Sequence, residues 1–496
     1  MKERNMYMSI RKKTRKILWI IYYGSLIYNI FVILDSAFAQ DVALRVSEPV
    51  DLVIADLKSY IPKRMNEADV PGLAIALIRN NQIIWAEGFG VVNRLTGKPV
   101  SSKTVFEVAS ISKVITAYTA LRLVDEGKLL IDKPVHTYLK KPWLPPSDFA
   151  DKITLRHLLS HSSGLSDDLF FRNKSIIFEP GTDFLYSGFG AEYIREIIEQ
   201  MSGKSIEEEA REKVFNPLNM TGSSFVDDAN VMNSMANGHM RYSLIFLFFL
   251  VPFIIALVNV GIITLILNRL IKRKWGVSWQ HKIGVGLIAF MLSELVLYIL
   301  IGKPFPNLIR MTILCALAFF AFLFLTYIFI QRIIYFIKPL SQKKVMKATI
   351  TTLWMIISFI IFLKISGSIT GPVPKNHSNE ASAIGSLRST APDLANFLIE
   401  LSNPKYLSKT LGSQIDSTQI KINQDFSWGL GIGIQHSSNG DAIWQNANTF
   451  AFRGIMVIYP HEGYGVVVLT NSDTGLPVAY DVAGKALGGK AKWKFF

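Results

Sequence analysis

The chain has 496 residues, a formal net charge of +15 and a single cysteine, and its mean hydropathy is +0.29. Half of its residues are hydrophobic, which is too apolar for an ordinary soluble protein of this length, and two or three domains are expected. The basic residues lie in short runs beside apolar segments, as in membrane proteins, which argues against a nucleic-acid partner. The single cysteine, Cys315, excludes an intrachain disulfide.

Residues 1–39 have the pattern of a secretory signal peptide. Arg11 to Lys16 form a basic start, Ile17 to Leu34 are apolar, and Ala37-Phe38-Ala39 resembles a cleavage site. The apolar run is long for a signal peptide, so an uncleaved N-terminal anchor is the competing interpretation. In either case the chain after residue 40 is expected to be exported.

Residues 40–241 are expected to form the first part of an exported domain. Residues 40–66 have an amphipathic helical pattern, and two strand-like runs, 73–78 and 83–91, are joined by a polar turn. Helical patterns then dominate, and helices are predicted at 110–126, 155–159, 192–201 and 205–214.

Ser110 and Lys113, at the start of the apolar helix, are the most informative residues of this part. A serine and a lysine three residues apart share one helix face, so the amine can take the proton of the hydroxyl. Ser-x-x-Lys occurs four times in the chain. The other three occurrences lie in the basic leader, in a basic loop and across a proline, and they begin at Ser9, Ser341 and Ser402. Only Ser110 therefore has the setting of a nucleophile.

Residues 242–366 contain four apolar runs that are long enough to span a bilayer, near 242–267, 283–301, 311–330 and 348–366. The loop between the first two runs and the loop between the last two are basic, which predicts that both are cytoplasmic. Four crossings return the chain to the same side. Residues 40–241 and 367–496 are therefore both expected on the extracytoplasmic face of the cell membrane.

Residues 367–496 are expected to complete the exported domain. A helix is predicted at 391–401, and strands are predicted at 427–435, 442–445, 452–459 and 463–471. Strands at both ends of the exported sequence, with helices between them, predict an α+β domain whose sheet combines both parts. An all-α transmembrane bundle would interrupt this domain.

Several stretches resemble, in the same order, the serine hydrolases related to class C β-lactamases and penicillin-binding proteins. They are Phe106–Lys113, Leu123–Leu129, Ile153–Leu165, Pro180-Gly181, Tyr186-Ser187 and Val466–Asn471. The resemblance covers residues 70–230 well and 380–475 moderately. It implies a β-lactamase/transpeptidase-like fold, with an antiparallel sheet flanked by helices and an all-helical region. Residues 242–366 have no counterpart in the soluble members of this family.

The resemblance also implies roles for individual residues. Ser110 matches the nucleophile that accepts the acyl group, Lys113 matches its base or proton relay, and Tyr186 matches a tyrosine that shuttles a proton to the leaving group. His161 matches a structural loop and not a catalytic residue. An oxyanion hole is expected from the backbone N–H groups of Ser110 and Asn448.

Two motifs depart from the pattern of this family. Gly188 replaces the asparagine of the Tyr-x-Asn motif, and the motif that is usually Lys or His, a small residue and Gly reads Gln445-Asn446-Ala447. We expect Gln445, Asn446, Ala447 and Asn448 to border the substrate. Because neither Gln445 nor Asn446 is cationic, recognition of a substrate carboxylate is expected to be poor. The sequence therefore predicts a weaker or redirected enzyme.

The function predicted from these features is a membrane-tethered, extracytoplasmic serine hydrolase that forms an acyl-enzyme at Ser110. Its expected partners are the lipid bilayer and a small-molecule or peptide substrate, including cell-wall-related peptides. The alternative is a non-catalytic receptor or sensor on the same fold. A transporter, suggested by Glu294 within the second apolar run, is the least favoured hypothesis. The eight histidines show no metal-ligand spacing, so neither a metal nor a cofactor is expected.

Overall fold

The computed structural model describes residues 43–166, 174–241, 370–373, 375, 379–489 and 491–495. The predicted leader, 1–39, and the four predicted spans within 242–366 lie outside the described residues and stay predictions. Among the helices in the described ranges, none combines the length and the apolarity needed to cross a bilayer.

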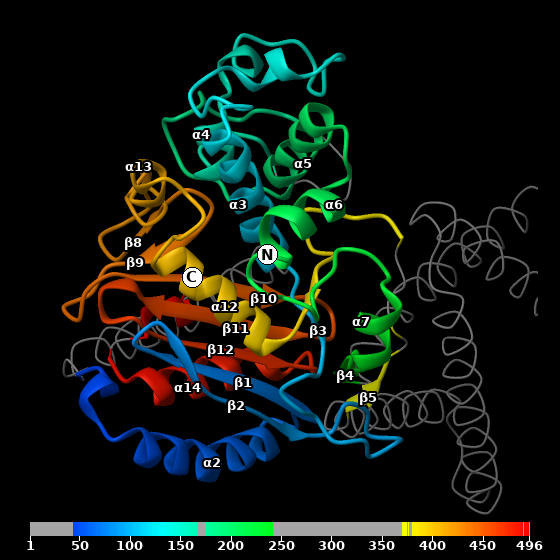
Figure 1. Ribbon diagram of the computed structural model, residues 1–496, viewed down its shortest axis with the longest axis vertical. Helices are drawn as coiled ribbons and strands as arrows, with labels where there is room; N and C mark the ends of the chain where they lie inside the picture. The colour runs from blue at the N-terminus through cyan, green and yellow to red at the C-terminus, as the bar shows by residue number, and fades with distance from the viewer. Residues whose placement is uncertain are drawn as a thin grey trace, which may run out of the picture.

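An antiparallel sheet of eight strands forms the centre of the molecule (Figure 1). Its order is β2-β1-β12-β11-β10-β9-β8-β7, so that the hairpin of β1 (Gly72–Arg79) and β2 (Gln82–Gly90) joins strands from the end of the chain. Those later strands are β7 (Ile420–Lys421), β8 (Phe426–Trp428), β9 (Gly433–Gln435), β10 (Ala442–Asn448), β11 (Arg453–Tyr459) and β12 (Tyr464–Thr470). The prediction that one sheet combines strands from before and after residues 242–366 is confirmed.

Helices cover both faces of this sheet. On one face lie α2 (Val50–Glu67) and α14 (Gly475–Leu487), and on the other lies α12 (Ala391–Ser402) (Figure 1). Because side chains alternate along a strand, β1 sends Leu73 and Ile75 into the core beneath α2 and α14, and Ala74 and Ala76 into the core beneath α12. The sheet therefore separates two apolar cores, and residue parity decides which core a side chain enters.

A helical region packs beyond α12 and carries most of the residues that precede 241. Its helices are α3 (Ile111–Asp125), α4 (Leu155–Leu159), α5 (Gly188–Ser202), α6 (Ile206–Ala210), the π-helical turn η4 (Arg211–Phe215) and α7 (Ala229–Ser234). Nearly all residues of α3 are buried.

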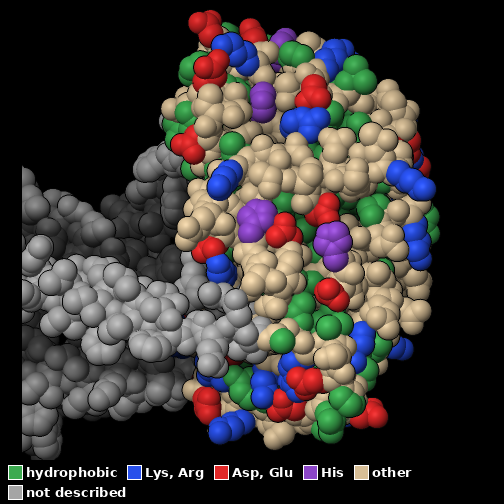
Figure 2. Space-filling model, turned by 90° about the vertical axis from the view of Figure 1, so that its left-hand side faces the viewer, with side chains coloured by type: hydrophobic (Ala, Val, Ile, Leu, Met, Phe, Trp, Pro, Cys, Tyr) green, Lys and Arg blue, Asp and Glu red, His purple; other side chains and the backbone are tan. Residues whose placement is uncertain are grey.

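The face of the molecule seen in Figure 2 carries Lys and Arg side chains interspersed with Asp and Glu side chains. This face has no continuous stripe of one sign of charge.

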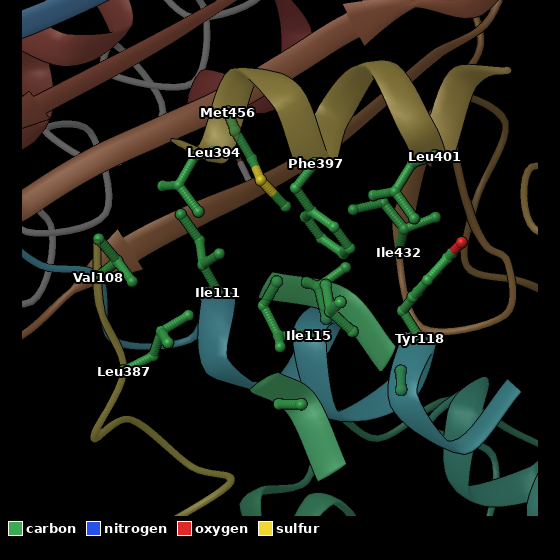
Figure 3. Packing of buried hydrophobic residues seen from close by; sticks show 14 of the residues in the cluster. Val108, Ile111, Ile115, Tyr118, Leu387, Leu394, Phe397, Leu401, Ile432 and Met456 are labelled. Carbon is green, nitrogen blue, oxygen red and sulfur yellow. The ribbon is translucent and has the colours of Figure 1, made fainter. Parts of the chain in front are cut away.

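Figure 3 shows how α3 is fixed to the sheet. Ile111 and Ile115 of α3 lie against Leu394 and Phe397 of α12, and Met456 of β11 closes the same core. The helix that begins at the predicted nucleophile is therefore held by an apolar core that spans both parts of the chain.

Two short antiparallel pairs complete the connection between these parts. One pairs β3 (Phe106–Glu107) with β6 (Arg388–Ser389). The other pairs β4 (His239–Arg241) with β5 (Thr370–Pro372), so that Arg241 lies directly opposite Thr370. The remaining short elements are η1 (Arg45–Ser47), η2 (Val135–Tyr138), η3 (Ala150–Lys152), α13 (Lys409–Gly412), η6 (Pro460–Glu462) and η7 (Lys492–Phe495). The chain thus leaves the described domain and returns to it at the same place.

Two predicted elements differ from the structure, and one helix was missed. The strand expected at 427–435 is two strands, β8 and β9, because a turn at Gly431 with a φ of +89° reverses the chain between them. The amphipathic helix expected at 40–66 begins only at Val50, directly after Pro49. The helix α14 was not predicted at all.

Candidate active site

Ser110 lies at a tight turn between β3 and α3. The preceding residue, Ala109, has a φ of +45°, a left-handed conformation that is uncommon for a residue with a Cβ and that is often found at functional sites. Ser110 is the N-cap residue of α3, but its side chain makes no capping hydrogen bond. Its hydroxyl is therefore available to a partner other than the helix backbone.

That partner is Lys113, one turn further along α3. Lys113 Nζ donates to Ser110 Oγ at 3.0 Å and to the backbone carbonyl of Ile384 at 2.9 Å. The lysine side chain is held in one position because only 8% of the residue is exposed. The structure thus brings the predicted nucleophile and its predicted base into direct contact.

Tyr186 lies beside the same lysine. Lys113 Nζ is 5.1 Å from the centre of the Tyr186 ring, and the Tyr186 hydroxyl accepts a hydrogen bond of 3.4 Å from Gln445 Nε2. The ring also packs against Trp428, with ring centres 5.5 Å apart. Lysine, tyrosine, tryptophan and glutamine side chains from four elements therefore meet around Tyr186. They come from α3, the loop before α5, β8 and β10.

His161 supports Tyr186 and does not contact the nucleophile through any hydrogen bond of the described residues. Its Nδ1 accepts the backbone N–H of Ser187 at 3.2 Å, and its ring centre lies 4.4 Å from that of Tyr186. Burial, with the nearby charge of Lys113, lowers the pKa of His161 to about 3. A neutral imidazole that fixes the loop before α5 agrees with the structural role that the sequence suggested.

The predicted third motif lies on β10, and its residues face different ways. Gln445 shares the parity of Ile443 and Ala447, which enter the core on the α3 side of the sheet. Asn446 has the opposite parity, and its Nδ2 donates to Tyr480 of α14 at 3.2 Å. Strand alternation therefore places the side chain of Gln445 at the site, while Asn446 holds β10 from the other face.

Ala447 and Asn448 contribute to the site in different ways. Ala447 is fully buried, so its side chain is part of the core. Thr449 N donates to Phe452 O at 3.0 Å, which places odd-numbered residues in the hydrogen-bonded pairs with β11. The N–H groups of Asn446 and Asn448 therefore point to the opposite edge of β10. On that edge the ladder with β9 ends at Trp444, which leaves the Asn448 N–H directed past the end of β9.

The chain resembles known proteins in sequence and in fold. Residues 57–243 match the family model described as Beta-lactamase. A penicillin-binding protein homologue from Pyrococcus abyssi has a TM-score of 0.55 at 20% identity over 89% of this chain and 79% of that protein. The D-alanine carboxypeptidase AmpC from Burkholderia cenocepacia has a TM-score of 0.53 at 15% identity over 88% and 99%. The fold is that of the β-lactamases and penicillin-binding proteins.

Curated relatives match the first part of the chain. Penicillin-binding protein 4 of Amycolatopsis lactamdurans is 28% identical over 190 residues, which cover 35% of this chain and 50% of that protein. Esterase EstB of Burkholderia gladioli is 26% identical over 202 residues, covering 35% and 51%. The chain thus spans about half the length of these relatives.

One contact of this β-lactamase fold was not predicted from the sequence. The second hydrogen bond of Lys113 goes to the backbone carbonyl of Ile384, in a loop that follows β5. Any residue type can present a carbonyl, so the sequence around Ile384 carries no chemical signal of this contact. The nearest sequence signal is Thr390, which caps α12 and marks where the preceding loop must end.

A second serine with a histidine partner lies at the edge of the sheet. Ser427 Oγ is 2.8 Å from His436 Nε2, and His436 Nδ1 is 3.0 Å from Asp441 Oδ2. Ser427 also contacts Thr418 Oγ1 at 2.8 Å, and only 1% of the residue is exposed. A nucleophile must be reachable by its substrate, so this chain of hydrogen bonds is suited to fixing β8 against the turn after β9.

In the part of the chain that the structure describes, no three His, Cys, Asp or Glu side chains are grouped so that they could hold a metal ion. The reactive side chains that the structure brings together are the hydroxyl of Ser110, the amine of Lys113 and the phenol of Tyr186.

Proposed function

We propose that this protein is a serine hydrolase that cleaves an ester or amide through an acyl-enzyme at Ser110. The observation that carries the proposal is the 3.0 Å contact between Lys113 Nζ and Ser110 Oγ, with Tyr186 beside the lysine. The match to the Beta-lactamase family model and the esterase and penicillin-binding relatives support the same chemistry.

The proposed reaction has two stages. Acting as the base, Lys113 takes the hydroxyl proton while Ser110 Oγ forms a bond to the substrate carbonyl carbon, and the N–H groups of Ser110 and Asn448 stabilise the oxyanion. When the bond to the leaving group breaks, that group takes a proton relayed through Lys113 and Tyr186. Water then attacks the acyl-enzyme, releases the acid and restores the Ser110 hydroxyl.

The neutral third motif favours substrates without a carboxylate next to the scissile bond. Gln445 is 2% exposed and offers an amide, which gives less stabilisation to a carboxylate than a cation would. We therefore propose that neutral esters and amides are better substrates than peptides that end in a carboxylate. Cell-wall-related peptides remain among the proposed substrates because the chain resembles penicillin-binding proteins.

Covalent labelling tests this function on the full-length protein. A tagged fluorophosphonate and a tagged penicillin are added to the wild type, Ser110→Ala and Ser427→Ala. Ser427→Ala is a matched control because the Ser427 hydroxyl, like that of Ser110, has a nitrogen-bearing side chain as its hydrogen-bond partner, here His436. We expect label on the wild type and on Ser427→Ala, and none on Ser110→Ala. An unlabelled wild type, or equal labelling of Ser110→Ala, would overturn the proposal.

We further propose that the hydrolase domain is tethered outside the cytoplasm by the four predicted spans in 242–366. The proposal is supported by the lengths of the apolar runs, their basic loops and the adjacency of Arg241 and Thr370. Protease added to spheroplasts would digest the hydrolase domain and spare a tag placed in the loop at 269–282. Digestion of that tag, with protection of the hydrolase domain, would contradict the proposed orientation.

A receptor or sensor on the same fold is the second candidate. It is favoured by Gly188 and Gln445 in place of the usual side chains, and by the paired strands β4 and β5 that lead into residues 242–369. A cellular phenotype that survives Ser110→Ala but is lost in Asn448→Trp, at the exposed end of β10, would support the receptor. Loss of the phenotype in Ser110→Ala supports the hydrolase.

A further inference from the structure

The loop formed by residues 382–387, called the strap below, crosses the turn that carries the nucleophile. Its centre supplies the Ile384 carbonyl that accepts the hydrogen bond from Lys113. Its C-terminal end is fixed to that turn, because Leu387 N donates to Ser112 Oγ at 3.0 Å and Val108 N donates to Leu387 O at 3.0 Å. The side chains of Val108 and Leu387 lie together beside the start of α3 (Figure 3).

Glu192 of α5 fixes the other end of the strap. Its Oε1 accepts from Ser382 Oγ at 2.5 Å and from the backbone N–H of Ile384 at 3.3 Å. Its Oε2 accepts from Arg195 Nε at 2.6 Å, and its side chain is only 15% exposed. One carboxylate therefore holds the peptide unit next to the carbonyl that Lys113 uses.

The contact between Glu192 and the strap joins α5 to the strap, and the site depends on the relative position of these two elements. α5 begins directly after Tyr186, and the strap carries the acceptor for Lys113. Gly188 offers no side chain to Lys113, so the carbonyl of Ile384 and the hydroxyl of Ser110 are the hydrogen-bond acceptors that hold its amine among the described residues. A shift of the strap would move the Ile384 carbonyl and would therefore also move the amine of Lys113.

We propose that Glu192 is a positioning residue, which places the Ile384 carbonyl so that the amine of Lys113 points at Ser110. This inference rests on the proposed hydrolase function for its kinetic consequence, but the link between Glu192 and the strap stands on the contacts alone. Nothing in the motifs identified from the sequence includes Glu192.

The test compares four single variants of the full-length protein and the double variant Glu192→Ala/Ser382→Ala. Glu192→Ala removes the link between α5 and the strap, and Glu192→Gln keeps an oxygen that can accept hydrogen bonds from the strap. Ser382→Ala removes one of the two hydrogen bonds that Glu192 accepts from the strap. Glu196→Ala is the matched control, because Glu196 lies on the same helix, is 41% exposed and pairs only weakly with Arg195, at 3.9 Å. Hydrogen exchange of the strap and the rate of fluorophosphonate labelling are measured for each.

In Glu192→Ala we expect faster exchange in the strap. We also expect the limiting labelling rate to fall about 10-fold to 100-fold, the order of loss caused by displacing a catalytic group by about 1 Å. The probe concentration that gives half the limiting rate should stay unchanged, and Glu192→Gln should recover most of the rate. Ser382→Ala should add little in the Glu192→Ala background, because both changes break one link. Glu196→Ala should match the wild type.

The outcomes separate the two proposals. Unchanged exchange in Glu192→Ala overturns the inference, and so does labelling of that variant at the wild-type rate. If the wild type is unlabelled while Glu192→Ala loosens the strap, the hydrolase function fails and the link to the strap is retained. Equal losses in Glu192→Ala and Glu196→Ala indicate a general effect of charge on α5 and also overturn the inference.

Discussion

Gln445 is the third-motif side chain that contacts Tyr186 from β10. Its amide contacts Tyr186 and the carbonyl of Asn446, and no positive charge stands at this position of the strand. The neighbouring residue Asn446, which the sequence placed at the substrate with it, contacts α14 instead. Adjacent residues of a strand point to opposite faces of the sheet. Of Gln445 and Asn446, both expected with Ala447 and Asn448 to border the substrate, only Gln445 therefore faces Tyr186.

A cation at this position should redirect the enzyme. In Gln445→Lys we expect labelling by tagged penicillin, which carries a carboxylate, to rise about tenfold relative to labelling by a neutral ester probe, because hydrogen bonds to charged groups contribute about 1.5–3 kcal/mol. Gln445→Met is the control that removes the amide without adding charge, and it should not change the ratio of the two rates. Equal effects of Lys and Met on that ratio would contradict the prediction.

Glu107, three residues before the nucleophile, gives folding a pH dependence of unusual sign. Burial raises its pKa to about 7, although the positive charge of Arg388 opposes the shift. The folded state therefore holds a proton that the unfolded state has lost between about pH 4.5 and pH 7. In this window the free energy of unfolding contributed by Glu107 falls as the pH rises, and the loss is complete above pH 7.

Glu107→Gln should remove this dependence. We expect the variant to be more stable than the wild type at pH 8, by on the order of 1–3 kcal/mol, and to be close to it at pH 4, where the native carboxyl is protonated. The midpoint of thermal unfolding at the two pH values measures the difference. Glu67→Gln, at an exposed position of α2, is the control. A stabilisation of Glu107→Gln that is equal at both pH values would be inconsistent with this account.

At the scale of elements, the turn between β8 and β9 brings Trp428 to Tyr186. Gly431 N donates to Leu159 O at 3.0 Å, and a Cβ at Gly431 would lie 2.4 Å from the Cβ of Ala117 in α3. The turn is therefore pressed against the helical region. Its glycines are embedded in an apolar stretch, which is why the sequence pattern suggested a single strand over 427–435.

The close approach of this turn to α3 can be tested separately from backbone strain. Gly431 and Gly440 both have a positive φ, +89° and +96°, but a Cβ at Gly440 would meet nothing within 4 Å. Both alanine variants carry the conformational strain, and only Gly431→Ala adds the steric conflict. We expect Gly431→Ala to lower the free energy of unfolding by about 1–3 kcal/mol more than Gly440→Ala. Equal midpoints of thermal unfolding for the two variants would contradict the prediction, because they would show that the turn accommodates the added Cβ without loss of stability.

The sequence predicted the sheet better than it predicted the site. Alternation made the hairpin of β1 and β2 recognisable, and the Ser-x-x-Lys spacing located Ser110 and Lys113 because helix geometry alone brings such residues together. The Ile384 carbonyl and Glu192 could not be found in this way. Their roles depend on contacts between segments that are far apart in sequence, and a backbone carbonyl has no residue signature.

At the scale of the whole molecule, the pairing of β4 with β5 makes the hydrolase domain separable from residues 242–369. Arg241 and Thr370 are paired, so an Asn-Gly turn can join these strands as a hairpin. We expect a chain in which Asn-Gly replaces residues 242–369 to fold and to be labelled at Ser110 at the rate of the full-length protein. Ser110→Ala in the shortened chain is the control. A shortened chain that folds but is unlabelled, beside a labelled full-length protein, would mean that residues 242–369 take part in the reaction.

The position of β12 in the sheet has a consequence for biosynthesis. Because β12 lies between β1 and β11, the hairpin made early in the chain has no sheet to join until Tyr464–Thr470 has been synthesised. The acceptor carbonyl of Ile384 and the amide of Gln445 also come after residues 242–369. At about 5–20 residues per second, the nucleophile waits on the order of 20–70 s for these partners. Under the proposed function, a site assembled in this order has no activity until the last strands of the chain have been made.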